Sequence, residues 1–452
     1  MNRTLAEVAR VTGGELVGRD QAFLGVSTDS RTLESGALFT ALRGPNFNGN
    51  EFVAAAAARG AVGALVMRRA SVDISQIVVA DTLVALQSMA LAWRRNFRIP
   101  VLAVAGSNGK TTTKEMIASI LGTRGPCLAT RGNLNNHIGV PLTLMRLDDS
   151  HRSAVIEMGA NRVGDVAELV RWVLPDVAVV TNAGAEHLEG FVDLDGVARG
   201  EGEAIASLGP SGTAIINADD AYASYWRNIA GASRILTFGL REPADFTARQ
   251  VHQGIENGEF ISRFVLATPE GERAVRLRVG GEHNLANALA AAAAASAAGA
   301  SLEEQVRGLE SFHPVAGRLQ LKPGVRNSWI IDDSYNANPS SVRAGLDVLR
   351  SVGGVTWLVL GDMAELGEHA VQSHVQIGRY ARDCGVQRLF AIGPDSSRAA
   401  EAFGSGAEWF PDAESLIRRL SSEMAAGVTL LVKGSRINRL ERVVQALSGR
   451  GG

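Results

Sequence analysis

The sequence predicts an α/β protein of three domains: a small α/β domain at the N-terminus, a central domain around a parallel sheet, and a doubly wound C-terminal domain. Its 452 residues correspond to about three domains at roughly 150 residues each. Short apolar runs typical of buried strands alternate with segments of helical periodicity over most of the chain. Glycine is abundant, with 50 residues, and aromatic residues make up only 5%, which suits tight strand-to-helix turns and close helix-on-sheet packing.

Charge and cysteine content exclude several classes of protein. Lysine and arginine total 45 against 47 acidic residues, so the chain lacks the large basic surface of a nucleic-acid-binding protein. Cys127 and Cys384 form neither a disulfide framework nor a zinc-site spacing, which indicates a reducing compartment. No export signal opens the chain, and the alanine-rich run 285–300 is too short and too weakly apolar to span a bilayer. We expect a cytoplasmic monomer with no nucleic-acid partner.

The first domain is expected at residues 1–98. Its expected elements are a short N-terminal helix, strands at 37–42, 63–67 and 76–79, and a helix at 83–97. Leu86, Met89 and Trp93 recur at helical spacing in that last helix. The boundary follows at Pro100, because the residue before a proline avoids the helical conformation.

The second domain is expected at residues 99–314. Its expected strands are 101–105, 154–158, 177–181, 213–217 and 234–238. Helices between these apolar runs indicate a parallel sheet covered on both faces. Residues 246–279 alternate with a period of two, which predicts an antiparallel ribbon at the edge of that sheet. The alanine-rich helix after His283 and a helix after Ser301 complete the domain.

The third domain is expected at residues 315–452. Its expected strands are 329–332, 357–360, 388–392 and 429–432, with helices from about Ser341, His369, Ser397, Glu414 and Ile437. This strand–helix repeat predicts a Rossmann-like doubly wound sheet. No GxGxxG motif accompanies it, so the fold alone implies no dinucleotide.

The sharpest motif follows the strand at 101–105 and precedes a helix, as in P-loop ATPases. It reads Gly106-Ser107-Asn108-Gly109-Lys110-Thr111-Thr112. Backbone N–H groups at a helix N-terminus would cradle phosphates, Lys110 would bridge the β and γ phosphates, and Thr111 would hold Mg²⁺. Val104 stands where the commonest phosphate loop has glycine, yet the strand-loop-helix context favours a phosphate loop over a chance turn.

Polar residues follow other strands of the second domain. Glu157 ends one strand and His187 comes just after the next, so both would reach the ligand crevice at the carboxyl edge of the sheet. Glu157 suits Mg²⁺, although an ordinary loop carboxylate or a structural histidine would look the same. Asn133 and Asn136 lie in an amide-rich loop that either contacts a polar ligand or forms a polar turn.

More polar groups surround the second boundary. Asn284 and Asn287 share a helix face, where they can recognise an adenine edge or cap the helix. Arg318 lies between domains, where a cation can reach phosphates. The cluster that ends the next strand suits a ribose diol and includes Asp333, Tyr335, Asn336 and Asn338. Lys433 ends a later strand, so the third domain would face the phosphate loop across a crevice.

Jointly, these motifs resemble the Mur ligases, the ATP-dependent amide-forming enzymes of peptidoglycan precursor synthesis. The resemblance covers nearly the whole chain and rests on residues 27–31, 36–39, 106–112, 133–141, 157–160, 187–191, 283–287, 332–339, 361–367 and 433–436. The motifs at 333–339 and 361–367 resemble the member that adds D-alanyl-D-alanine to UDP-N-acetylmuramoyl-tripeptide.

The resemblance implies a role for each matching residue. Ser30 and Arg31 would hold the uridine diphosphate end of the substrate. The 106–112 loop, Arg318 and Lys433 would bind the phosphates of ATP, Asn287 with Asn284 beside it would contact the adenine, and Asp333 would contact the ribose. Thr111 and Glu157 would hold one Mg²⁺, and His187 would hold a second. The substrate would be contacted by Asn133, Asn136, Tyr335, Asn336 and Asn338. The implied reaction forms an acyl phosphate, with Lys110, Glu157, His187 and Arg318 as catalytic residues.

Two departures from the family pattern stand out. Residues 48–52 read Asn-Gly-Asn-Glu-Phe where the family usually has Asp-Gly-His before the aromatic residue. Glu201 aligns with a lysine that the family carbamylates with CO₂ to bind Mg²⁺. Glu201 is therefore expected to ligate the metal without CO₂; the alternative is a solvated helix residue beside Glu203.

Two other functions remain open from the sequence. A sibling Mur ligase or a folylpolyglutamate-type amide ligase would share the ATP site, although the latter needs no uridine-binding domain such as the one with the 27–31 motif. A regulatory ATP-binding module would hydrolyse ATP without an amine substrate.

Overall fold

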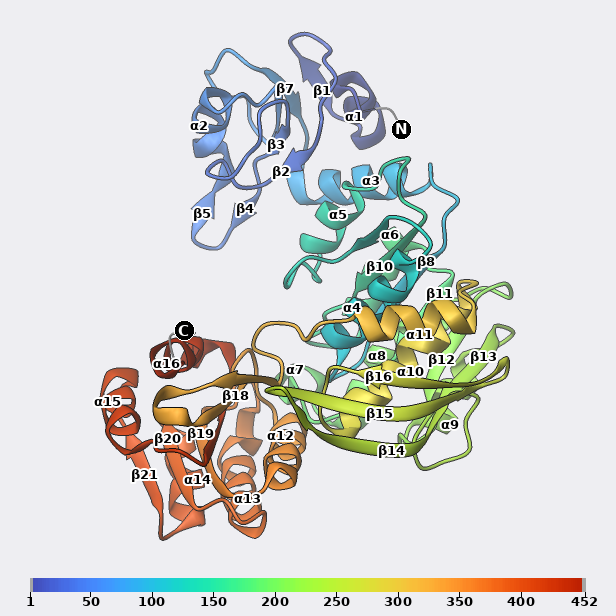
Figure 1. Ribbon diagram of the computed structural model, residues 1–452. Helices are drawn as coiled ribbons and strands as arrows, with labels where there is room; N and C mark the ends of the chain where they lie inside the picture. The colour runs from blue at the N-terminus through green and yellow to red at the C-terminus, as the bar shows by residue number, and fades with distance from the viewer. Residues whose placement is uncertain (1–2, 449–452) are drawn as a thin grey trace.

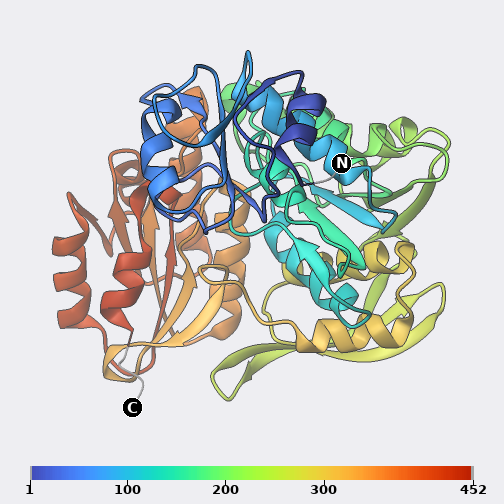
Figure 2. The ribbon, with the colours of Figure 1, turned by 90° about the horizontal axis from the view of Figure 1, so that it is seen from above.

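The computed structural model describes residues 3–448. Three α/β units follow one another along the chain (Figure 1). Seen from above, the N-terminal unit lies over the other two, which sit side by side (Figure 2). Within the described residues, no helix is both long and apolar enough to cross a membrane.

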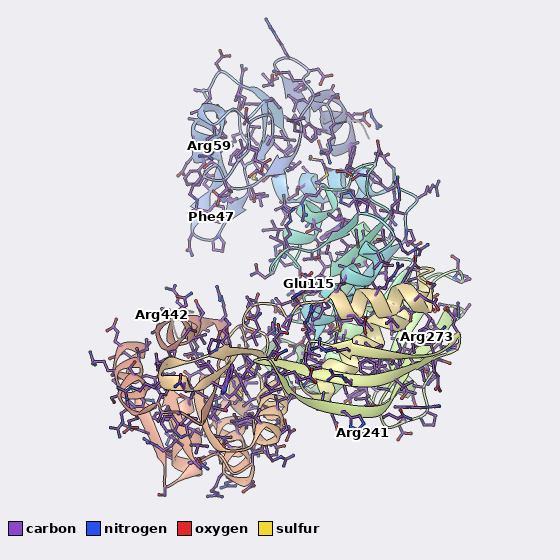
Figure 3. The ribbon with its side chains drawn as sticks, in the orientation of Figure 1. Phe47, Arg59, Glu115, Arg241, Arg273 and Arg442 are labelled. Carbon is purple, nitrogen blue, oxygen red and sulfur yellow. The ribbon has the colours of Figure 1, made fainter. Side chains whose placement is uncertain are left out.

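The N-terminal unit is a five-stranded mixed sheet. Its strand order is β1-β7-β6-β3-β2, formed by β1 (Glu15–Val17), β2 (Val26–Ser27), β3 (Leu38–Thr40), β6 (Gly63–Val66) and β7 (Ser75–Val78). The helices are α1 (Leu5–Thr12), α2 (Val53–Ala58) and α3 (Thr82–Arg94), and a short hairpin joins β4 (Arg43–Gly44) to β5 (Phe47–Asn48). Phe47 is 53% exposed, on the side of this unit turned toward the C-terminal unit (Figure 3).

The central unit is a six-stranded, fully parallel sheet of order β13-β12-β11-β8-β10-β9. Its strands are β8 (Val101–Ala105), β9 (Cys127–Ala129), β10 (Ser153–Glu157), β11 (Val177–Val180), β12 (Thr213–Asn217) and β13 (Arg234–Phe238). The helices are α4 (Lys110–Gly122), α5 (Gly139–Leu144), α6 (Asp165–Val173), α7 (Leu188–Phe191), α8 (Leu194–Ala206), α9 (Ala223–Ile229), α10 (Glu282–Ala297) and α11 (Leu302–Ser311).

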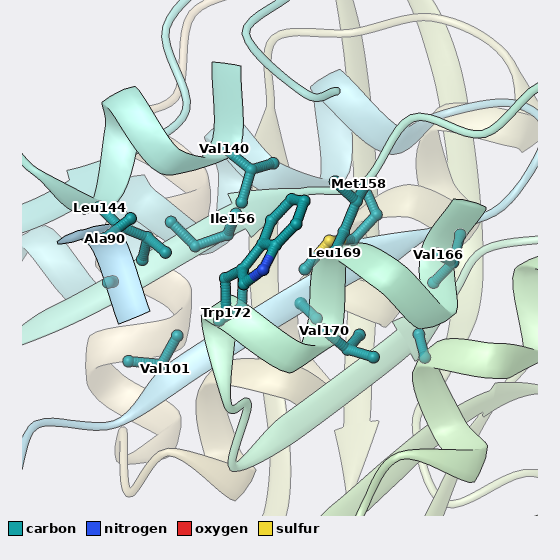
Figure 4. Close-up of a cluster of buried hydrophobic side chains, with 14 of the residues drawn as sticks. Ala90, Val101, Val140, Leu144, Ile156, Met158, Val166, Leu169, Val170 and Trp172 are labelled. Carbon is teal, nitrogen blue, oxygen red and sulfur yellow. The ribbon is translucent and has the colours of Figure 1, made fainter. Parts of the chain in front are cut away.

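Alternate side chains of each central strand enter two different cores. On β8, Val101 and Ala103 belong to one core, and Leu102 and Val104 to the other, as expected for a sheet covered on both faces. In the first core, Trp172 of α6 packs among Val140, Ile156 and Met158 (Figure 4). This contact fixes the carboxyl end of β10, where Glu157 lies.

The alternating segment forms its own sheet, which corrects the expected edge ribbon. Strands β14 (Thr247–Glu256), β15 (Glu259–Thr268) and β16 (Gly271–Leu277) pair antiparallel in a separate three-stranded sheet. The expected alternation with a period of two is present, but these strands pair with one another and not with the edge of the central sheet. One isolated bridge, between Phe238 and Phe246, links this segment to β13. The all-alanine stretch of α10 is fully buried, and its small side chains let the helix pack closely on α4.

The C-terminal unit is a six-stranded sheet of order β17-β18-β22-β19-β20-β21, with β17 antiparallel to the rest. Its strands are β17 (Gln320–Pro323), β18 (Trp329–Asp333), β19 (Val355–Gly361), β20 (Arg388–Ile392), β21 (Ala407–Phe410) and β22 (Val428–Lys433). The helices are α12 (Pro339–Val352), α13 (Ala370–Asp383), α14 (Ser396–Phe403), α15 (Ala413–Glu423) and α16 (Glu441–Leu447). The last helix begins later than expected, because a 3₁₀ turn and Arg439 at φ 49° come first.

Candidate active site

The phosphate-loop motif lies where the central sheet changes direction. The chain leaves β8 toward β10 and β9 on one side and later returns to β11 on the other, which is the position where open α/β sheets bind ligands. Gly106 has φ 119°, and a Cβ there would lie 2.1 Å from Oγ1 of Thr181; Gly109 has φ 83°, and its Cβ would lie 2.2 Å from Oδ1 of Asn287. Glycine is required at both positions for backbone conformation and for space.

Helix α4 begins with free backbone donors. Gly109 provides no side-chain cap, so the N–H groups of the first turn, which includes Thr111 and Thr112, are available to an anion. Beside them, the Ser107 hydroxyl accepts from the N–H of Gly184 at 2.8 Å and donates to its carbonyl at 3.1 Å. The loop is therefore held in shape while its donors stay open.

Lys110 is turned back toward the loop and toward a carboxylate that the sequence analysis did not select. Its Nζ donates to the carbonyls of Gly106 at 2.5 Å and Ser107 at 3.3 Å, and lies 3.2 Å from Oε1 of Glu186. Burial disfavours the charged lysine, but the carboxylates of Glu186, Glu201 and Glu157 outweigh it and raise the pKa of Lys110. Burial also raises the pKa of Glu186, while Lys110 opposes that shift.

Glu157 is placed and oriented as a cation ligand would be. Its N–H donates to Oγ1 of Thr130 at 3.0 Å, and its Oε1 accepts from Nδ2 of Asn135 at 2.9 Å. Its Oε2 is buried and has no hydrogen-bond partner. A buried, unpartnered carboxylate oxygen is costly unless it is paired, so the site fits a bound cation.

Glu201 lies under the phosphate loop and does not line the cavity, and its role as a metal ligand stays a prediction. It is fully buried on α8, and its Oε2 accepts from the N–H of Gly106 at 2.5 Å. Burial raises the pKa of Glu201, with Lys110 and the Gly106 N–H opposing. Its full burial contradicts the alternative of a solvated helix residue. Glu203, its neighbour, instead accepts from the N–H groups of Gly164 and Ala167.

Three contacts join the central and C-terminal units across the site. Nδ1 of His187 lies 2.7 Å from Oε2 of Glu365, and burial lowers the pKa of His187 while Glu365 opposes. Asn108 of the phosphate loop accepts from Nδ2 of Asn338 at 2.8 Å and donates to Oγ of Ser340 at 3.0 Å. Both units therefore build one site.

The amides of α10 form a short chain behind the loop. Asn284 donates to the Gly280 carbonyl at 2.9 Å and accepts from Asn287 at 3.2 Å. Asn287 in turn accepts from Oγ1 of Thr113 at 3.3 Å. The hydrogen bonds of Asn284 are local, which favours capping of the helix over recognition of a base edge for this residue. Asn287 faces Gly109 of the phosphate loop.

The C-terminal wall carries cations and an aromatic ring. Arg318 stacks over Tyr335, with its Cζ 4.2 Å from the ring centroid. Nζ of Lys433 lies 2.5 Å from Oδ2 of Asp333 and donates to the Asn336 carbonyl at 3.1 Å. Asp333 already has a partner, so a ribose hydroxyl would have to share it.

These groups line one cavity of about 650 Å³. Most of the predicted residues reach it: Ser107, Asn108, Gly109, Lys110, Thr111, Thr112, Asn133, Asn136, Glu157, His187, Asn284, Asn287, Arg318, Asp333, Tyr335, Asn336, Asn338 and Lys433. Residues that the sequence analysis passed over also line it: Asn135, Glu186, His283, Ser340, Glu365 and Arg436. Glu186 precedes the candidate His187, and Glu365 lies in the 361–367 motif; these positions were their only signal.

Four predicted residues lie away from the cavity wall. Gly106 opens the phosphate loop, and Glu201 lies beneath it. Ser30 and Arg31 belong to the N-terminal unit, between β2 and β3, and Arg31 pairs with Asp29 at 2.7 Å.

Asn136 lines the cavity, but its Oδ1 accepts from the N–H groups at residues 138 and 139, so it also shapes the turn before α5.

Comparison with known proteins identifies relatives over the whole chain. The Mur ligase family catalytic domain matches residues 23–107, the Mur ligase middle domain 104–295, and the Mur ligase glutamate ligase domain 317–436. The UDP-N-acetylmuramoyl-tripeptide--D-alanyl-D-alanine ligase of Escherichia coli K12 is 42% identical over 451 residues and covers 99% of each chain.

Solved structures agree with that relationship. MurF from Acinetobacter baumannii matches with a TM-score of 0.90 at 36% identity, over 98% of each chain. MurF ligase from Thermotoga maritima, solved in complex with ADP, matches with a TM-score of 0.82 at 26% identity, over 93% of this chain and 96% of that chain.

Proposed function

The chain belongs to the Mur ligase family, and from this premise we propose how its own residues carry out the reaction. The chain is an ATP-dependent ligase that adds D-alanyl-D-alanine to UDP-N-acetylmuramoyl-tripeptide in peptidoglycan synthesis. We place it in the cytoplasm as a monomer, with a substrate domain at 1–98, an ATP domain at 99–314 and a C-terminal ligase domain at 315–452.

ATP would bind between the central and C-terminal units. The observation that carries this is one cavity lined by the phosphate loop on one side and by Arg318 and Lys433 on the other. The free N–H groups of α4 and the Lys110 ammonium would hold the β and γ phosphates. Asn287 would face the adenine, and Asp333 the ribose.

Glu157 and Thr111 would hold one Mg²⁺ and His187 a second, since the unpartnered Oε2 of Glu157 suits a hard cation. Bound Mg²⁺ would neutralise charge on the phosphates during transfer. Within the described residues, no three acidic, histidine or cysteine side chains already converge as a metal cluster. The remaining ligands would therefore be phosphate oxygens and water, as is usual for Mg²⁺.

The chemistry would proceed in two steps. A terminal carboxylate oxygen of the tripeptide attacks the γ phosphorus, and ADP leaves with the bridging oxygen, giving an acyl phosphate. The amine of D-alanyl-D-alanine then attacks the acyl carbon, inorganic phosphate leaves, and the amine gives up a proton. Lys110 would stabilise the charge on the transferred phosphoryl group, and Ser30 and Arg31 of the N-terminal unit would hold the uridine diphosphate end.

The test is phosphate release with each substrate omitted in turn. We expect release only when ATP, UDP-N-acetylmuramoyl-tripeptide and D-alanyl-D-alanine are all present, together with a pentapeptide product of matching amount. Phosphate release that does not depend on D-alanyl-D-alanine would indicate a regulatory ATP-binding module instead. Release with a folate in place of the tripeptide and an amino acid in place of the dipeptide, or with the tripeptide and another amine, would indicate a sibling ligase.

A further inference from the structure

The surroundings of Lys110 contain more buried negative charge than positive charge. Glu157 is 3% exposed, Glu186 6% and Glu201 0%, and all three carboxylates act electrostatically on the single Lys110 ammonium. Three buried carboxylates therefore share one ammonium group. Buried charges in proteins are paired or bind metals.

Other buried lysines near the cavity are already engaged. Lys114 pairs with Glu115 at 2.6 Å and also donates to the Thr130 carbonyl at 2.6 Å. Lys433 pairs with Asp333 at 2.5 Å. A cation bound in the cavity would supply positive charge from the ligand side.

The three carboxylates differ in how they can meet a ligand. Oε2 of Glu201 is held by the Gly106 N–H beneath the loop, and its Oε1 is buried without a partner. Glu201 does not line the cavity. Glu157 reaches the wall with a buried oxygen that has no partner. Glu186 also reaches the wall, and its 3.2 Å contact with Lys110 is longer than the roughly 2.7–2.9 Å of a strong ammonium–carboxylate hydrogen bond.

We propose that Glu186, rather than Glu201, is the carboxylate that binds the divalent cation beside His187, and that it releases Lys110 to the nucleotide phosphates when it does so. This inference rests on the proposed ATP site. Glu186 and His187 are consecutive and both line the cavity, so an oxygen ligand and a nitrogen ligand come from one turn. The unpartnered Oε2 of Glu157, at the end of β10, gives the same cavity a second carboxylate.

The test measures cation binding directly, with Mn²⁺ as a spectroscopic substitute for Mg²⁺. Mn²⁺ binding to the full chain with ADP is followed by electron paramagnetic resonance for wild type, Glu186→Gln, Glu186→Asp and Glu201→Gln. The control is Glu189→Gln, which removes an exposed carboxylate three residues along the chain. Circular dichroism verifies that each variant folds, and Glu186→Asp keeps the charge if Glu186→Gln does not fold.

We expect Glu186→Gln to weaken Mn²⁺ binding about 10- to 100-fold, Glu186→Asp to weaken it less, and Glu189→Gln to match wild type. ADP binding without metal should stay the same or tighten in Glu186→Gln, because a carboxylate near the phosphates is removed. Mn²⁺ affinity unchanged in Glu186→Gln, or lost in Glu201→Gln alone, would overturn the proposal. Wild-type protein that binds ADP and Mn²⁺ yet forms no pentapeptide would refute the proposed function and leave this inference standing.

Discussion

Replacing Lys110 with alanine tests the phosphate loop and its buried ion pair together. The Lys110 side chain is 14% exposed and that of Glu186 is 8% exposed, so the substitution removes the proposed catalytic cation and also leaves a buried carboxylate without its partner. Losing one preorganised group that stabilises transition-state charge costs about 10²–10³ in kcat. Breaking a buried ion pair costs about 3–5 kcal/mol, and we expect the lower value because Glu186 can take up a proton.

The two effects separate in a second variant. About 3 kcal/mol corresponds to roughly 100-fold faster amide exchange, so Lys110→Ala should speed hydrogen exchange in β8 and α4 by that factor. Lys110→Ala with Glu186→Gln should recover most of the protection while the rate of ligation stays low. Phosphate release measures the rate of ligation, and hydrogen-exchange mass spectrometry measures the protection of the amides. Turnover of Lys110→Ala within a few-fold of wild type would refute the phosphate-loop assignment, and equal exchange in both variants would refute the buried-pair reasoning.

Three further substitutions or treatments test other parts of the account. Gly109→Ala should weaken ADP binding by more than about tenfold, equal to about 1.4 kcal/mol, because a Cβ would lie 2.2 Å from Asn287 Oδ1; calorimetric titration with unchanged affinity would contradict this. Arg3→Ala should raise KM for the uridine substrate more than it lowers kcat, because Arg3 stacks 4.5 Å from the Trp93 ring centroid and donates to carbonyls of the central unit; steady-state kinetics with an unchanged KM would count against that link. Burial raises the pKa of the Cys127 thiol to about 11, so native protein at pH 8 should resist iodoacetamide at this residue and react once unfolded; mass spectrometry showing fast native labelling would disprove it.

Local apolar pattern predicted the long parallel strands well and the short ones poorly. The expected runs 101–105, 213–217, 234–238 and 388–392 match the bounds of β8, β12, β13 and β20, because a strand buried on both faces must be apolar throughout. Strands β1, β2, β17 and β21 have only two to four residues, too few to show a clear apolar pattern. The alternation of residues 246–279 was visible in the sequence, but the pairing of the strands they form depends on tertiary contacts.

The strand-end rule predicted most of the cavity wall, while pairwise contacts stayed hidden. Glu157, His187 and Asp333 could be selected because they follow buried strands. The Lys110–Glu186 pair joins residues 76 apart in sequence, and no local pattern indicates such a contact. The sequence showed that a carboxylate, Glu201, stands at this position. It could not show that Glu201 is buried beneath the phosphate loop, because that burial depends on tertiary contacts.

The acyl-phosphate route is tested most directly by isotope transfer. UDP-N-acetylmuramoyl-tripeptide labelled with ¹⁸O in its terminal carboxylate is ligated with ATP and D-alanyl-D-alanine, and the inorganic phosphate is analysed by mass spectrometry. The account predicts that each phosphate released carries one ¹⁸O atom from the carboxylate, because that oxygen bonds to phosphorus before the amine displaces it. Unlabelled phosphate formed alongside the pentapeptide would contradict the account.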